Sequence, residues 1–209
     1  MVARTLKASS IILAGGKSLR LGYDKVLETV GRRSLVEKVV QTVATLSDNI
    51  IIVTASERTM PEFDHYPNLK VVHDMYPGKG PLNGIYTGLY ASGTRCNIVV
   101  AADMPFLNIP LLQYMVEQVD DFDMVTPRVG DRVEPLHSVY TRDCMDTIMQ
   151  MFEEGVLGVH KLHSRVKTRY IDVDEITRFD PAKLSFFNIN TEKDLLKARK
   201  LHEGSNEDD

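Results

Sequence analysis

The sequence contains little cysteine, no tryptophan and no long apolar run. Its two cysteines, Cys96 and Cys144, have neither the spacing of a metal site nor the density of a disulfide scaffold. We therefore predict that both are buried thiols that behave as small hydrophobic side chains, in a protein of a reducing compartment. No apolar stretch approaches the roughly 18 residues that a membrane-spanning helix needs. We therefore expect a cytoplasmic protein without membrane segments.

An excess of positive charge is also missing. Lys and Arg number 25 against 29 Asp and Glu, which gives a formal net charge of −4. Nucleic-acid-binding domains usually carry a basic excess, so we expect no nucleic-acid partner. Small anionic ligands remain possible because they respond to local charge. The length of 209 residues suits one domain, which we place at residues 1–203, followed by a disordered polar tail at 204–209.

The apolar pattern predicts alternating strands and helices. Almost wholly apolar runs at 49–54 and 97–102 are typical of strands buried on both faces. Apolar residues recur at helical spacing over 34–46, and Ser34 at the start of this stretch is predicted to be the N-cap. Further strands are predicted at 69–73, 123–127, 136–140 and 168–173, and further helices at 82–91, 109–119, 143–152, 159–163 and 191–201. This order indicates an α/β fold in which a mainly parallel central sheet has helices on both faces, with a second half that departs from simple alternation.

Residues 11–25 form the most unusual stretch. A short β-branched run ends in Gly15-Gly16, and Lys17, Arg20 and Lys25 follow. Glycines without a Cβ allow a sharp turn and a close backbone approach to a ligand. Backbone N–H groups in such a turn bind anions, and neighbouring cations add full charges. The stretch predicts a phosphate site; the alternative is an ordinary turn beside solvated charges.

Two common phosphate-binding motifs do not fit. A P-loop, G-x-x-x-x-G-K-[ST], would need its first glycine where Ile11 stands. A dinucleotide fingerprint, G-x-G-x-x-G, can begin at Gly78 and Gly80 but then reaches Asn83 instead of a third glycine. The failed spacings disfavour a Walker ATPase and a nicotinamide-dependent dehydrogenase.

Polar or flexible residues stand where predicted strands end. Gly15, Thr54, Asp74 and Asp103 occupy such positions. In open parallel sheets, ligands bind beyond the carboxyl ends of the strands, so these residues predict one shared site. Alternatives stay open, since Asp103 can initiate a turn and Asp74 can cap the next segment. His137, within an apolar strand, is interpreted as a hydrogen-bonded core histidine.

Five motifs in chain order resemble the nucleotidyltransferases related to molybdenum-cofactor guanylyltransferase. They are Leu13-Ala14-Gly15-Gly16 with Arg20 and Lys25, Gly80-Pro81-Leu82, Ala102-Asp103-Met104-Pro105, the Pro-Leu-x-x-x-Tyr segment within 134–140, and Asn188-Ile189-Asn190-Thr191. The resemblance covers almost the whole chain. It implies a three-layer, Rossmann-like nucleotidyltransferase fold.

The resemblance also implies a reaction. GMP would pass from GTP to the terminal phosphate of molybdopterin, releasing pyrophosphate and forming molybdopterin guanine dinucleotide. The Leu-Ala-Gly-Gly and Pro-Leu-His segments are similar to those of guanine-specific members. One alternative is a related enzyme that uses CTP or another phosphorylated acceptor, and another is a non-catalytic nucleotide- or cofactor-binding chaperone. GTP and a molybdopterin-type cofactor are the implied ligands, with molybdoenzymes or cofactor chaperones as further partners.

Site roles follow from the same resemblance. Lys25, Arg20 and Asp103 would be catalytic, and Asp103 would bind Mg²⁺. Acceptor contacts would come from Asn188, Asn190, Pro81 and Leu82. The position of Thr54 holds asparagine in some members. The implied nucleotide contacts are Leu13, Ala14, Gly15, Gly16, Lys25, Thr54, Asp74 and Asp103.

Overall fold

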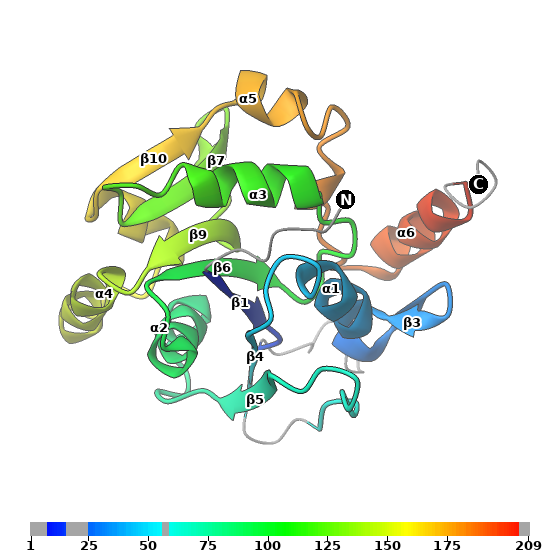
Figure 1. Ribbon diagram of the computed structural model, residues 1–209, viewed down its shortest axis with the longest axis horizontal. Coiled ribbons are helices and arrows are strands. Elements are labelled where there is room, and N and C mark those ends of the chain that lie inside the picture. The colour runs from blue at the N-terminus through cyan, green and yellow to red at the C-terminus, as the bar shows by residue number, and fades with distance from the viewer. Residues whose placement is uncertain (1–7, 16–24, 56–58, 205–209) are drawn as a thin grey trace.

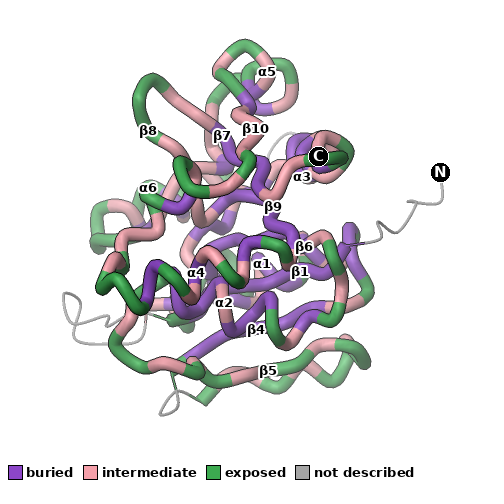
Figure 2. Tube along the Cα trace, turned by 90° about the vertical axis from the view of Figure 1, so that its left-hand side faces the viewer, coloured by how far each residue is buried: buried purple, intermediate pink, exposed green. Residues whose placement is uncertain are grey.

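The fold is built on one eight-stranded mixed sheet with the order β10-β7-β9-β6-β1-β4-β5, and β8 pairs with β7 (Figure 1). The computed structural model describes residues 8–15, 25–55 and 59–204. The strands are β1 (Ala8–Leu13), β4 (Ile50–Thr54), β5 (Leu69–His73), β6 (Cys96–Ala101), β7 (Met124–Val129), β8 (Arg132–Val133), β9 (His137–Thr141) and β10 (Thr168–Ile171). Figure 2 shows the central strands as buried and β5 as a largely exposed edge.

Strand direction divides the sheet. β6, β1, β4 and β5 are mutually parallel, and β10 is parallel to β7. β9 is antiparallel to both of its neighbours, β6 and β7. Because β9 runs the other way, it begins at the edge of the sheet where β1, β4 and β6 end. The sequence predicted that the second half of the chain departs from a simple alternation of parallel strands and helices, and the reversed direction of β9 is that departure.

Helices cover both faces of the sheet (Figure 1). On one face, α1 (Leu35–Val43), α3 (Ile109–Glu117) and α5 (Val173–Thr177) pack over one buried cluster. On the other, α2 (Pro81–Ser92) and α4 (Cys144–Glu153) pack over a second cluster with the short helix η2 (Val159–Ser164). A smaller cluster joins α6 (Glu192–Gly204) to the hairpin β2–β3 (Thr29–Val30 and Arg33–Ser34). The remaining short helices are η1 (Lys25–Leu27) and η3 (Leu184–Phe186).

Local sequence signals begin two of the helices as predicted. Ser34 caps α1, and the Glu37 carboxylate accepts from the Ser34 backbone N–H at 2.8 Å. Thr191 and Asp194 form the same reciprocal pair before α6, with the Thr191 N–H donating to Asp194 at 2.9 Å. Each pair satisfies backbone N–H groups that have no partner within the helix.

Three segments differ from the sequence-based expectation. The strand predicted over 168–173 stops at Ile171, because Asp172 and Glu175 form a capping box that begins α5. The hairpin β2–β3 was not predicted, since each of its strands has only two residues. The last helix continues to Gly204, so the tail predicted from 204 begins no earlier than 205, and residues 205–209 lie outside the described chain.

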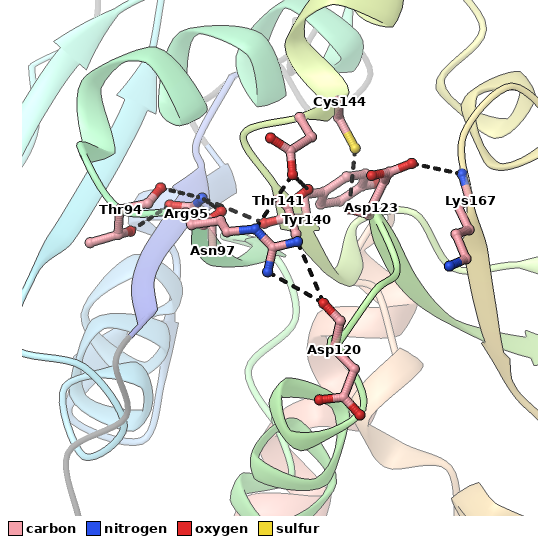
Figure 3. A network of polar contacts seen from close by, with 10 residues as sticks. Thr94, Arg95, Asn97, Asp120, Asp123, Tyr140, Thr141, Cys144 and Lys167 are labelled. Carbon is pink, nitrogen blue, oxygen red and sulfur yellow. Dashed lines mark hydrogen bonds and ion pairs between the residues drawn. The ribbon is translucent and has the colours of Figure 1, made fainter.

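A polar network lies at the edge where β6 begins and β9 ends (Figure 3). Arg95 donates to the carbonyl oxygen of Asp120 at 3.4 Å. The Cys144 thiol donates to the carbonyl oxygen of Asp123 at 3.2 Å. Burial raises the pKa of Cys144 to about 12 and that of Cys96 to about 11, so both thiols are protonated at neutral pH. Both are unpaired thiols; Cys144 is buried as predicted, whereas Cys96 is only half-buried.

Among residues 8–15, 25–55 and 59–204, no helix combines the length and the apolar character that crossing a membrane requires.

Candidate active site

Asp103 lies at the centre of the edge where the parallel strands end. It follows β6, whose end is tied to β1 by a hydrogen bond from the Ala102 N–H to the Leu13 carbonyl oxygen at 3.0 Å. The Asp103 carbonyl oxygen accepts from the Ile189 N–H at 3.0 Å. This single bond brings the segment that contains Asn188 and Asn190 alongside the end of β6.

The Lys25 ammonium group joins three distant parts of the chain. Its Nζ atom lies 2.5 Å from Asp103 Oδ2, 2.9 Å from Asn190 Oδ1 and 3.2 Å from the carbonyl oxygen of Ile189. The exposed fraction of the side chain is 20% for Lys25 and 16% for Asp103. Partial removal from water strengthens the attraction between the two charges. The structure therefore brings together three residues that the sequence placed in one site.

The same oxygen atoms fit a hard divalent cation. A carboxylate, an amide oxygen and a backbone carbonyl, from Asp103, Asn190 and Ile189, converge within 3.2 Å of one positive centre. These are the ligand types that Mg²⁺ accepts. Within the described residues, no three His, Cys, Asp or Glu side chains gather to hold a metal. Mg²⁺ at Asp103 would therefore complete its shell with phosphate oxygens and water, as it commonly does.

Asp74 lies on the other side of β1, against two glycines. A Cβ atom added at Gly15 would lie 3.8 Å from Asp74 Oδ2, and one added at Gly84 would lie 3.9 Å from Asp74 Oδ1. Burial raises the pKa of the Asp74 carboxyl, with a smaller opposing effect from His73. The carboxylate thus faces the turn after β1 and the first turns of α2, where a ligand can approach the backbone closely.

Thr54 brings a buried hydroxyl group next to Asp74. Its carbonyl oxygen accepts from the Asp74 N–H at 3.0 Å, and its side chain is fully buried. Within the described chain, the Thr54 hydroxyl has no hydrogen-bond partner. A buried hydroxyl without a partner costs about 1–3 kcal/mol. Because the side chain has no exposed surface, Thr54 supports the end of β4, and the nucleotide contact predicted for it stays a prediction.

The four predicted acceptor contacts are separated in the structure. Asn190 is exposed beside Lys25, and Asn188 is half-buried in the same segment. Pro81 and Leu82 instead begin α2, which packs on β1, β4 and β5. Leu82 is fully buried in the core, so its side chain cannot touch an acceptor. Leu82 supports the fold, and Pro81 begins the helix whose Gly84 lies close to Asp74. The acceptor contacts predicted for Pro81 and Leu82 stay predictions.

The glycine loop is described only in part. Leu13 and Ala14 are buried, and Ala14 donates to the Val53 carbonyl oxygen at 2.8 Å, so both hold the end of β1 within the sheet. Gly15 is exposed at the start of the loop. The predictions made for Gly16 and Arg20 concern residues outside the described part of the chain.

His137 departs from its interpretation as a hydrogen-bonded core histidine. The side chain is fully buried and meets the Phe186 ring edge-on, with ring centroids 5.0 Å apart. Its position in the core is as predicted, but within the described chain neither ring nitrogen has a hydrogen-bond partner. Burial lowers the pKa of His137 to about 4, with an opposing attraction from Asp180. The residue is therefore neutral at physiological pH.

Residues 10–168 match the model of a family described as the MobA-like NTP transferase domain. The chain belongs to this family. Membership makes it a nucleotidyltransferase, and it confirms the family resemblance and the enzyme class that the motifs predicted.

Named relatives of this family resemble the chain over nearly its full length. A probable molybdenum cofactor guanylyltransferase of Pelotomaculum thermopropionicum is 34% identical over 96% of both chains. A molybdenum cofactor guanylyltransferase of Desulfosudis oleivorans is 30% identical over 91% of this chain and 93% of the relative. The solved structure of molybdopterin-guanine dinucleotide biosynthesis protein A from Archaeoglobus fulgidus, at 25% identity, superposes with a TM-score of 0.79 and covers 92% of this chain and 97% of that one. The predicted three-layer, Rossmann-like fold is confirmed by this likeness.

Proposed function

We propose that the protein transfers GMP from GTP to the terminal phosphate of molybdopterin, producing molybdopterin guanine dinucleotide and pyrophosphate. The observation that carries the proposal is the convergence of Lys25, Asp103 and Asn190 at the end of the parallel strands. This cluster lies in a chain that matches guanylyltransferase relatives from end to end. The proposal thus combines the site with the named activity of those relatives.

The reaction requires mainly that the two substrates are positioned and that the negative charge of their phosphates is neutralised. A phosphate oxygen of the acceptor forms a bond to the α-phosphorus of GTP, and the bond from that phosphorus to the pyrophosphate breaks. The attacking group is already an anion, so no strong general base is required. Transfers of this kind depend on holding the reactants in line and on stabilising the charge that develops.

Each residue of the cluster has a role in this scheme. Lys25 carries a positive charge that can neutralise the α-phosphate. Asp103 and Asn190 would hold Mg²⁺, which supplies further neutralisation of the triphosphate when it is bound. Lys25 now bonds to those same oxygens, and it would turn toward the phosphate if Asp103 and Asn190 held the cation. Arg20 and the Gly15-Gly16 backbone are proposed to hold the rest of the triphosphate.

The nucleotide would lie over β1, β4 and β5. Asp74, which faces Gly15 and Gly84, would supply acceptor atoms there for the hydroxyl or amino donors of a nucleoside. We propose guanine as the base and the cytoplasm as the compartment. The free thiols Cys96 and Cys144 support a reducing environment. The product would then pass to molybdoenzymes or to chaperones that carry the cofactor.

Pyrophosphate release tests the proposal. The protein is incubated with Mg²⁺, molybdopterin and either GTP or CTP, with Asp103→Asn as the inactive control. We expect release with GTP and a loss of about 100-fold or more in the control, because the substitution removes the metal-binding charge. Release with CTP alone would overturn the choice of base. No release with either nucleotide and a validated acceptor would favour a binding protein over an enzyme.

A further inference from the structure

Side chains of α2 bind the backbone of the two residues that follow Asp74. The Met75 N–H donates to the Thr87 hydroxyl oxygen at 3.1 Å, and the Tyr76 N–H donates to Asn83 Oδ1 at 3.1 Å. β5 has already ended at this point, so neither N–H group belongs to the pairing of the sheet. The helix therefore replaces the neighbouring strand as the hydrogen-bond partner of this segment.

Asn83 and Thr87 form a buried polar pair on one face of α2. The exposed fraction is 1% for Asn83 and 2% for Thr87. They stand four residues apart, which makes them neighbours along the helix, and the Thr87 hydroxyl donates to Asn83 Oδ1 at 3.4 Å. Motif matching missed both residues, because the resemblance in this segment rests on residues 80–82. Two polar side chains at helical spacing in a mainly apolar helix were the available signal.

α2 is itself held close to β1. A Cβ atom added at Gly84 would lie 3.1 Å from Leu13 Cδ2, so the helix backbone approaches the strand where β1 ends. The Tyr76 ring meets the Tyr86 ring of α2 with ring centroids 5.8 Å apart, a separation at which aromatic pairs attract. The segment after β5 is thus joined to α2 by two backbone hydrogen bonds and a ring contact.

These contacts fix the backbone that carries the Asp74 carboxylate. The Asp74 N–H donates to the Thr54 carbonyl oxygen at 3.0 Å, which holds the residue on the side of β4. The bonds to α2 hold the two residues that come next. The Asp74 oxygens lie 3.8 Å from the Cβ position of Gly15 and 3.9 Å from that of Gly84. Movement of the following backbone would therefore shift the carboxylate relative to the turn after β1.

We infer that Asn83 and Thr87 are positioning residues of the nucleotide site. Both side chains are buried, so they act through the backbone after Asp74 and not by touching the ligand. They keep the Asp74 carboxylate where it can accept from a hydroxyl or amino donor of the nucleoside. An acceptor that is already ordered lowers the entropy cost of binding. This inference rests on the proposed function, because that function brings the nucleoside to Asp74.

A double-mutant cycle with Asp74→Asn tests the inference. Calorimetry gives the Kd of GTP with Mg²⁺ for the unchanged protein, Thr87→Val, Asp74→Asn and the double variant. Valine keeps the shape of threonine but cannot accept from the Met75 N–H. Thr87→Val should raise the Kd about fivefold, the equivalent of one ordinary hydrogen bond. In the Asp74→Asn background the same change should alter the Kd less than about twofold, because the carboxylate through which it acts is gone.

Two further variants separate positioning from general stability. Thr87→Ser keeps the hydroxyl group and should bind GTP within about twofold of the unchanged protein. Asn83→Ala removes the acceptor for the Tyr76 N–H and should behave like Thr87→Val in the same cycle, which also covers the case in which Thr87→Val does not fold. In steady-state kinetics, the KM for GTP should rise in Thr87→Val while the KM for molybdopterin stays within about twofold, since only one substrate site depends on the pair.

The outcomes separate this inference from the proposed function. Equal factors in both backgrounds of the cycle would overturn the inference, as would an unchanged Kd in both Thr87→Val and Asn83→Ala. An unchanged Kd in Asp74→Asn would also overturn it, because the pair would then have no contact to position. If the unchanged protein binds GTP but releases no pyrophosphate with a validated acceptor, the proposed function fails, and the cycle still decides the inference. Absence of GTP binding by the unchanged protein would overturn both.

Discussion

At the scale of single residues, Lys25 links regions of the chain that are far apart in sequence. Its ammonium group bonds to Asp103, 78 residues away, and to Asn190, 165 residues away. The sequence predicted a role for each residue from its own motif. It could not predict the contact, which depends on the hydrogen bond between the Ile189 N–H and Asp103 in the folded chain.

Replacing Lys25 with alanine should impair the chemistry more than the fold. We expect kcat to fall about 100-fold or more, because a charge that faces the transferred phosphate is lost. The melting temperature should change by only a few degrees, since the ion pair is partly exposed to water. Steady-state kinetics and thermal melts give the two values, and Lys70→Ala, an exposed change on β5, is the matched control. A normal kcat/KM with a lowered melting temperature would show that Lys25 is structural.

The neutral, buried His137 predicts a loss of stability in mild acid. Its pKa is about 4 in the folded protein, against an ordinary value of 6.5. At a pH between these two pKa values, His137 binds a proton in the unfolded chain but not in the folded protein. The free energy of unfolding should therefore decrease as the pH falls from about 6.5 to 4, by an amount on the order of 3 kcal/mol from this residue, and its contribution should level off at lower pH.

Urea unfolding at pH 7 and pH 4.5 measures this effect. His137→Leu keeps an apolar side chain in the site and removes the titrating group. The variant should lose less stability than the unchanged protein between the two pH values. His160→Gln, at an exposed position, is the control and should behave like the unchanged protein. Equal losses in the His137→Leu variant and the unchanged protein would contradict the role assigned to His137.

At the scale of elements, the close packing of α2 on β1 depends on Gly88. A Cβ atom at this position would lie 2.4 Å from Ile11 Cγ2, closer than such atoms approach. Gly88→Ala gains about 1 kcal/mol of helix propensity. Overpacking of a buried contact typically costs about 1–3 kcal/mol, so we expect net destabilisation. Thermal melts should show a lowered midpoint, while Gly204→Ala, which faces open space in α6, should change little. A stabilised Gly88→Ala variant would show that the helix can move away from the sheet.

Elements were predictable where the chain carries a local signal. Apolar runs identified the buried strands, and the capping pairs at Ser34 and Thr191 identified helix starts. The end of β10 was missed although Asp172 and Glu175 carry a similar signal, because the apolar pattern continues to Val173. Gly88 within a predicted helix favours close packing against a neighbouring element, but no local pattern shows that the neighbour is Ile11 of β1.

At the scale of the whole molecule, the residues of the predicted site lie at the edge of the sheet where β1, β4, β5 and β6 end. The alternation of strands and helices predicted a parallel sheet and a site at its carboxyl edge. The reversal of β9 was not predictable in the same way, since it depends on how the hairpin β7–β8 returns the chain to β6. Consequently the sequence predicted a site at the end of β1 and β6 but not the direction of β9 beside it.

Nucleotide binding should stabilise the whole molecule selectively. Mg²⁺ with GTP is expected to raise the melting temperature, because a ligand present at 100 times its Kd adds about 2.7 kcal/mol to the free energy of unfolding. CTP at the same concentration should produce a smaller increase. Asp74→Asn should reduce the GTP effect if the carboxylate contacts the nucleoside. Equal shifts with both nucleotides would contradict guanine preference, and an unchanged shift in the variant would remove Asp74 from the contact.

The reversal of β9 also bears on how such a protein can diversify. The turn before β9 follows the hairpin β7–β8 and lies beside the end of β6, whereas the proposed nucleotide contacts follow β1, β4 and β5. Insertions between Val129 and Arg132, where Gly130 already makes a turn with positive φ, would lengthen this hairpin without shifting the register of β1 or β4. A lineage can thus vary this hairpin while the strands β1, β4 and β6, which carry the predicted site, stay unchanged.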